Sequence, residues 1–70
     1  MAEIRAEMVA NVWKVLVSEG DQVDDGDTLV ILESMKMEIS VLAESPGIVT
    51  KLHVAEGDVV QEDELIAEIG

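Results

Sequence analysis

Short runs of alternating apolar and polar residues, separated by turn residues, extend along the whole chain. The runs are rich in Val, Ile and Leu, and Gly, Asp, Ser or Pro interrupts them. A period of two is typical of half-buried strands, and turn residues recur too often for helices of ordinary length. The pattern predicts the strands 3–8, 11–17, 28–34, 37–42, 48–54 and 65–69, with short pieces near 22–23 and 59–60. Such strands indicate an all-β sandwich or flattened β-barrel.

An internal repeat organises these strands. Residues 12–23 align with residues 49–60 at an offset of 37, and seven of the twelve positions are identical. Gly20 and Gly57 occupy the turn of each copy, where glycine adopts a positive φ at little cost. Two copies of one unit predict a pseudo-twofold domain rather than a solenoid. Because Lys36 lies between the copies, the two termini should meet at the opposite end of the domain.

The segment between the copies, residues 32–39, reads LESMKMEI. With Met35 and Lys36 as the two central residues of a hairpin, Glu33 faces Glu38, and the neighbouring pairs follow as Ser34–Met37, Leu32–Ile39 and Val30–Val41. The apolar pairs then share the core face. Two features disfavour this turn: such turns prefer Asn-Gly because both residues need positive φ, and like charges face each other. Local rules broken within a consistent pattern indicate a functional site.

Two interpretations of this hairpin remain open from the residues alone. In the first, Lys36 is an ordinary surface lysine and Met35 and Met37 fill gaps in the core. In the second, both methionines are exposed and form an adaptable contact surface for a partner, as flexible thioether side chains often do.

Composition narrows the classes of function. The 70 residues predict one domain, residues 1–70, with an aliphatic core and no cysteine. The net charge of −12 disfavours nucleic acid and anionic lipid as partners. The longest apolar run, residues 29–32, is far shorter than the roughly 20 residues of a membrane span, and the first residues do not resemble a signal peptide. We therefore expect a cytoplasmic protein, and one too small for a ligand pocket of ordinary size.

The sequence gives little support for a catalytic or a metal-binding site. The loop 21–27 is rich in aspartate, but Val23 and Leu32 occupy positions at which a calcium loop needs oxygen ligands. His53 falls in a strand pattern, and Ser34 has neither a neighbouring base nor the context of a nucleophile elbow. We therefore expect neither a metal site nor an enzyme in its own right.

Three features together resemble the biotinyl domains of biotin-dependent carboxylases. They are the sequence ESMKME at residues 33–38, the Gly-Asp pairs at 20–21 and 57–58, and the turn SPGIV at 45–49. The resemblance covers nearly the whole chain. It implies a barrel-sandwich hybrid of two four-stranded antiparallel sheets, with biotin covalently attached to Lys36 on an exposed hairpin. It also implies a stand-alone, monomeric carrier in its minimal form.

The resemblance assigns a role to each residue of the motif. A biotin protein ligase would biotinylate Lys36, and Met35 and Met37 match the flanks that the ligase and the carboxylase read. Glu33 matches the family's position of specificity against lipoylation. The domain would then carry a carboxyl group, as carboxybiotin, between biotin carboxylase and carboxyltransferase subunits.

Two alternatives remain. The first is a lipoyl carrier domain, although lipoyl domains usually have an acidic residue where Met35 precedes the lysine. The second is an interaction module that remains unmodified.

Overall fold

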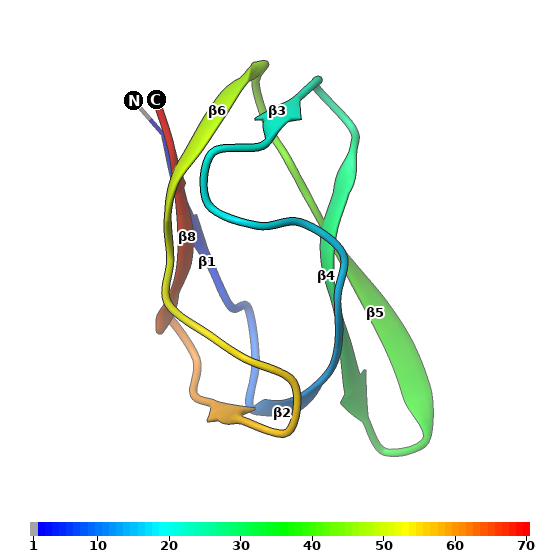
Figure 1. Cartoon of the computed structure of the whole chain (residues 1–70). Coiled ribbons are helices and arrows are strands. Elements are labelled where there is room, and N and C mark those ends of the chain that lie inside the picture. Colours follow the sequence, from blue (N-terminus) through cyan, green and yellow to red (C-terminus); the bar gives the residue numbers. More distant parts are fainter. Residues whose placement is uncertain (1) are drawn as a thin grey trace.

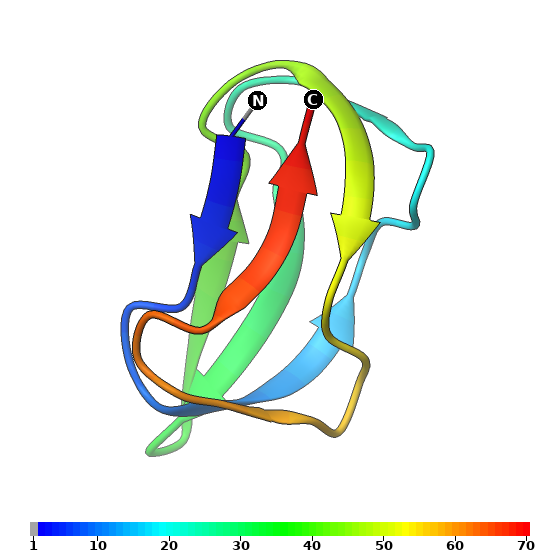
Figure 2. The ribbon, with the colours of Figure 1, turned by 90° about the vertical axis from the view of Figure 1, so that its left-hand side faces the viewer.

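The computed structural model describes residues 2–70 as two antiparallel sheets of four strands packed face to face (Figure 1). The strands are β1 (Ala2–Arg5), β2 (Ala10–Val15), β3 (Gln22–Val23), β4 (Thr28–Ser34), β5 (Met37–Leu42), β6 (Gly47–Leu52), β7 (Val59–Val60) and β8 (Leu65–Ile69). One sheet has the order β1-β8-β6-β3 and faces the viewer in Figure 2; the other has the order β5-β4-β2-β7. The predicted fold class is confirmed.

Each copy of the repeat contributes strands to both sheets, and the two copies are related by a pseudo-twofold axis, as the repeat predicts. Strands β2, β3 and β4 of one copy correspond, 37 residues later, to β6, β7 and β8 of the other. The turns meet across the copies: the Gly20 N–H donates to the Val49 carbonyl at 2.8 Å, and the Gly57 N–H donates to the Val12 carbonyl at 2.9 Å. Both glycines have the expected positive φ, +94° and +93°. Each copy is therefore completed by contacts with the other.

Two glutamates form further hydrogen bonds between the two copies. The Glu19 carboxylate accepts a hydrogen bond from the Leu52 N–H at 2.9 Å, and the Glu56 carboxylate accepts one from the Val15 N–H at 3.2 Å. Each bond satisfies a backbone donor at the end of a strand, where the ladder stops. The sequence alone indicated only a turn at these positions. The sequence feature that could have indicated this role is the glutamate that directly precedes the turn glycine in both copies.

The core between the sheets is entirely aliphatic. Its fully buried large side chains are Leu29, Leu32, Ile66, Ile69, Val12, Val30, Val49 and Val60. None of the described residues buries a polar or charged side chain. A core of these residues follows the hydrophobic period, and burial of each large side chain stabilises the fold by about 1.5–3 kcal/mol.

Three predicted strands are too long. The first ends at Arg5 rather than residue 8, because the Ala6 N–H donates to the Glu64 carbonyl and the Ala6 carbonyl accepts from the Asp63 N–H, both outside a ladder. The strands predicted to end at 17 and 54 end at Val15 and Leu52. In all three places the chain leaves the sheet and contacts a loop of the other copy. The local hydrophobic period does not predict such contacts.

The β4–β5 hairpin lies at one end of the domain and the chain ends lie at the other (Figure 1). Ala2 pairs with Ile69 between β1 and β8. The domain measures 31 × 17 × 17 Å, and the turn projects from one end of its long axis. The predicted placement of the termini opposite Lys36 is therefore confirmed. Over residues 2–70 we find no helix that is long and apolar enough to cross a membrane.

Candidate modification site on the β4–β5 hairpin

The hairpin has the predicted register. Glu33 pairs with Glu38 and Ser34 with Met37, so Met35 and Lys36 form the turn. In the next pair away from the turn, Leu32 is buried and its partner Ile39 packs against the core. Alternation along the strands places the two glutamates on the outer face. A shift of one residue would exchange the leucine for glutamate in the core, which explains why the turn is fixed at this position.

The turn has an unusual backbone. Met35 has φ +54° and Lys36 has φ +65°, both in the left-handed region. Two positive φ values define a type I′ turn, which matches the twist of the flanking strands. A non-glycine residue costs roughly 1–2 kcal/mol there, because its Cβ approaches the following carbonyl. The β4–β5 ladder therefore holds two large side chains in a conformation that neither prefers.

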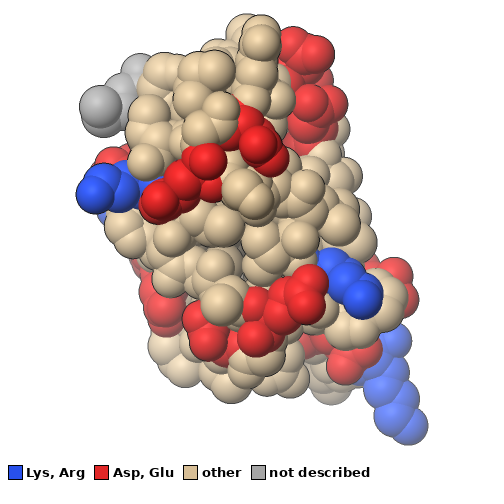
Figure 3. All heavy atoms as spheres, viewed as in Figure 1, with Lys and Arg blue, Asp and Glu red and all other residues tan. Residues whose placement is uncertain are grey.

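Both methionines and the lysine are exposed. Met35 is 92% exposed and Met37 66%, so the interpretation in which they fill core gaps is wrong. Within residues 2–70, Lys36 makes no ion pair and no side-chain hydrogen bond, although two glutamates lie nearby on the strands. In Figure 3 a basic side chain extends beyond the outline of the molecule at this end.

This geometry suits covalent attachment of a carboxylic acid through an amide. A primary amine on four flexible methylene groups is presented to solvent, and no described neighbour must move when it becomes a neutral amide. Among residues 2–70, no side chain forms a hydrogen bond or an ion pair with the amine, so these residues supply no general base at Nζ.

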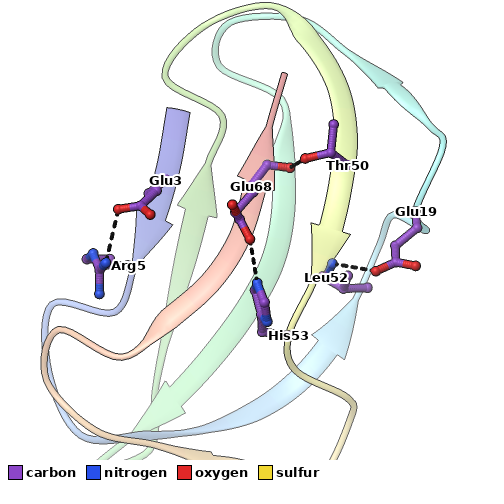
Figure 4. A network of polar contacts seen from close by, with 7 residues as sticks. All are labelled: Glu3, Arg5, Glu19, Thr50, Leu52, His53 and Glu68. Carbon is purple, nitrogen blue, oxygen red and sulfur yellow. Dashed lines mark hydrogen bonds and ion pairs between the residues drawn. The ribbon is translucent and has the colours of Figure 1, made fainter. Parts of the chain in front are cut away.

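The other candidates have structural roles. His53 is exposed, and its Nε2 lies 2.9 Å from the Glu68 carboxylate on the outer face of the first sheet (Figure 4). In the acidic loop, the Asp27 carboxylate accepts a hydrogen bond from the Asp24 N–H at 2.8 Å and closes the turn. Over the described residues, no three acidic or histidine side chains gather in a way that could hold a metal ion.

One expectation about cavities is wrong. A groove of about 520 Å³ runs between β1 and β5, within the usual size range of ligand sites. Its lining includes Ile4, Met8 and Val41, with Arg5 and Glu44 among its charged residues. The groove forms because β1 and β5 are the edge strands of different sheets and no further strand closes the gap. No histidine lines the groove.

Comparison with known proteins gives a consistent family. A family model described as "Biotin-requiring enzyme" matches residues 2–69. A relative named "Biotinylated protein TB7.3 homolog" from Mycobacterium leprae is 63% identical over 70 residues, 99% of each chain.

Two solved structures share the fold. The urea carboxylase of Kluyveromyces lactis matches 99% of this chain with a TM-score of 0.92 and 35% identity, over 6% of that protein. The lipoyl domain of the 2-oxoglutarate dehydrogenase complex from Azotobacter vinelandii matches 97% of this chain with a TM-score of 0.83 and 26% identity, over 94% of that domain.

The chain therefore belongs to the biotin/lipoyl attachment family. The predicted family is confirmed, and the family's description supports biotin as the cofactor. The domains of this family are carrier domains.

Proposed function

We propose that this protein is a biotin carrier whose Lys36 is the attachment point, and that it serves a biotin-dependent carboxylase. The observation that carries the proposal is an unpaired, exposed amine on a rigid, strained type I′ turn. The similarity to a biotinylated protein and to part of a urea carboxylase supports the choice of biotin over lipoate. An unmodified interaction module would have no need to hold a lysine in a left-handed conformation.

In the proposed attachment, this chain forms one new covalent bond, the amide at the Lys36 Nζ. The Lys36 Nζ, deprotonated in the ligase active site, attacks the carbonyl carbon of activated biotin; the amide forms, adenylate leaves and the amine loses its proton. The reaction removes one positive charge from a molecule of net charge −12. When bound, biotin supplies a ureido nitrogen that can accept and release a carboxyl group.

Residues beside Lys36 would control which enzyme modifies it. Met35 and Met37 surround the amine with flexible apolar surface, which adapts to the different active sites that a carrier must visit. Glu33 points outward from β4 opposite Glu38, three residues before the lysine. We propose that this carboxylate favours a biotin ligase over a lipoate ligase through contact with a basic group of the former.

The shape of the domain fits delivery of a small group. The cross-section is 17 × 17 Å and the long axis is 31 Å. The modified end can therefore enter a cleft while the body of the domain remains outside. Because strands β4 and β5 pair up to the last residue before the turn, the attachment point is rigid and only the lysine arm is flexible.

The test is modification in vitro with two purified ligases. Wild-type protein is incubated with a biotin protein ligase, ATP and biotin, or with a lipoate ligase, ATP and lipoate. We expect one biotinyl group per chain and at least 100-fold slower lipoylation. Glu33→Ala should lower the ratio of the biotinylation rate to the lipoylation rate. Lys36→Arg, which keeps the charge, should abolish both reactions. Faster lipoylation of the wild-type protein would favour the lipoyl alternative instead.

A further inference from the structure

The pseudo-twofold repeat allows the two outer faces of the domain to be compared position by position. Because the copies share one backbone, equivalent positions face the same demands from the fold. A systematic difference in side chains between the two faces must therefore reflect something other than folding. The outer faces do differ in this way.

On the outer face of the sheet that contains β6 and β8, three positions are polar. The Thr50 hydroxyl donates to the Glu68 carbonyl at 3.1 Å, and His53 contacts the Glu68 carboxylate at 2.9 Å. Figure 4 shows these side chains gathered on one side of the sheet. This polar cluster (Thr50, His53 and Glu68) is an ordinary solvated sheet surface.

The equivalent positions on the other sheet, 37 residues earlier, are apolar. They are Trp13, Leu16 and Ile31, which we call the apolar cluster. The backbone is the same: Lys14 pairs with Ile31 across a bulge as Lys51 pairs with Glu68.

Two members of the apolar cluster are substantially exposed. Trp13 is 43% exposed and Leu16 53%, so neither contributes fully to the core. Leu42 and Val59 on the same sheet are also exposed, and their equivalents are Arg5 and Gln22; the one strand residue that reverses the pattern is Ile48, whose equivalent is Asn11. Exposed apolar side chains that the fold does not require, concentrated on one face, indicate a binding surface.

The apolar cluster lies on the sheet that carries Lys36. Ile31 is four residues before Met35, about 13 Å along the strand from the turn. Between them, Glu33 and Glu38 point outward on the same face. A protein interface of ordinary size buries about 800 Å² per partner, equivalent to a disc of about 16 Å radius. An interface centred on the turn and approaching from this side therefore reaches Ile31 and the neighbouring Trp13. Leu16 lies beyond its edge, because the Leu16 N–H donates to the carbonyl of Leu29, about 20 Å along the strand from the turn.

We propose that Trp13 and Ile31 of the apolar cluster form part of the docking surface for the enzyme that acylates Lys36, an inference that rests on the proposed function. The bare lysine side chain reaches only about 6 Å at ordinary bond lengths. The acylating enzyme must therefore bring its active site against the hairpin and the adjacent sheet. After attachment the arm is longer, so later enzymes need less contact with the sheet. The matching surface on the enzyme is apolar and flanked by basic side chains that face Glu33 and Glu38.

The repeat itself supplies matched variants for the test. Trp13→Thr and Ile31→Glu introduce the residues that the same backbone already accommodates at the polar cluster, and Thr50→Ala is the control on the opposite face. Rates of biotinylation by a mycobacterial biotin protein ligase are measured at saturating ATP and biotin, with circular dichroism to verify folding. We expect Trp13→Thr to lower kcat/KM for the protein substrate 10- to 30-fold through KM, since a tryptophan anchor often contributes this much. Thr50→Ala should remain within twofold of wild type.

Each outcome decides the proposal. Equal kcat/KM for wild type, Trp13→Thr and Ile31→Glu would overturn it, as would an equal loss in Thr50→Ala. If ligation is unchanged but carboxylation of the biotinylated domain is slower, the surface serves the carboxylase instead. A concentration-dependent wild-type dimer that Trp13→Thr abolishes would assign the surface to a second copy. Wild-type protein that accepts no biotin would contradict the proposed function itself.

Discussion

The left-handed turn at Met35 and Lys36 should cost the protein stability, and Met35→Asn should recover part of that cost. Met35 has φ +54° and is 92% exposed, so the substitution relieves backbone strain and removes almost no buried surface. Asparagine tolerates this region better than other residues with a Cβ. Of the roughly 1–2 kcal/mol of strain at this position, we expect about 1 kcal/mol to be recovered. In a domain of this size that raises Tm by about 4–8 °C.

Thermal and urea unfolding, followed by circular dichroism, measure the change. Met37→Asn is the matched control, because Met37 lies in β5 and has no positive φ. It removes the same kind of side chain without relieving strain and should give no increase in Tm. If Met35→Asn is no more stable than wild type while Met37→Asn behaves as expected, the turn is not strained and the reasoning is refuted. If the proposed function is correct, the stabilised variant should also be biotinylated more slowly.

Two further substitutions test how the repeat is assembled. Gly47→Ala should lower the free energy of unfolding by about 1–3 kcal/mol, because its Cβ would lie 2.7 Å from the Gly70 carbonyl oxygen; chemical denaturation that shows no loss would contradict this close approach. Gly26→Asp should cost no more than about 1 kcal/mol, since Asp63 occupies the equivalent turn with φ +68°; a loss above about 3 kcal/mol would show that the two turns are not equivalent.

The sequence was sufficient to predict the hairpin and the symmetry of the fold. Alternation of Leu32 with Glu33 allows only one register that keeps charge out of the core, and the 37-residue repeat requires two copies of one unit. The exposure of Met35 could not be decided in this way, since a methionine is equally compatible with a core gap. It follows from the position of the turn, which lies at one end of the domain beyond Leu32, the last buried residue of β4 (Figure 1).

Features that depend on contacts between the copies were not predicted. The bond from the Leu52 N–H to Glu19 joins residues 33 positions apart, and no local pattern signals it. The groove between β1 and β5 depends on which strands become sheet edges, which periodicity does not specify. The bulge between Val12 and Lys14 shifts the alternation, so the shared face of Trp13 and Ile31 is visible only in the folded chain.

The proposed function requires that another enzyme covalently attaches biotin to the exposed amine of Lys36. The most direct measurement is the intact mass of the wild-type protein and of Lys36→Arg after co-expression with a biotin protein ligase in medium that contains biotin. We expect the wild-type protein to gain the mass of one biotinyl group, located by peptide mapping to Lys36, and the variant to gain none. A lipoyl mass, a biotinyl group on another lysine, or an unchanged wild-type mass would contradict the account.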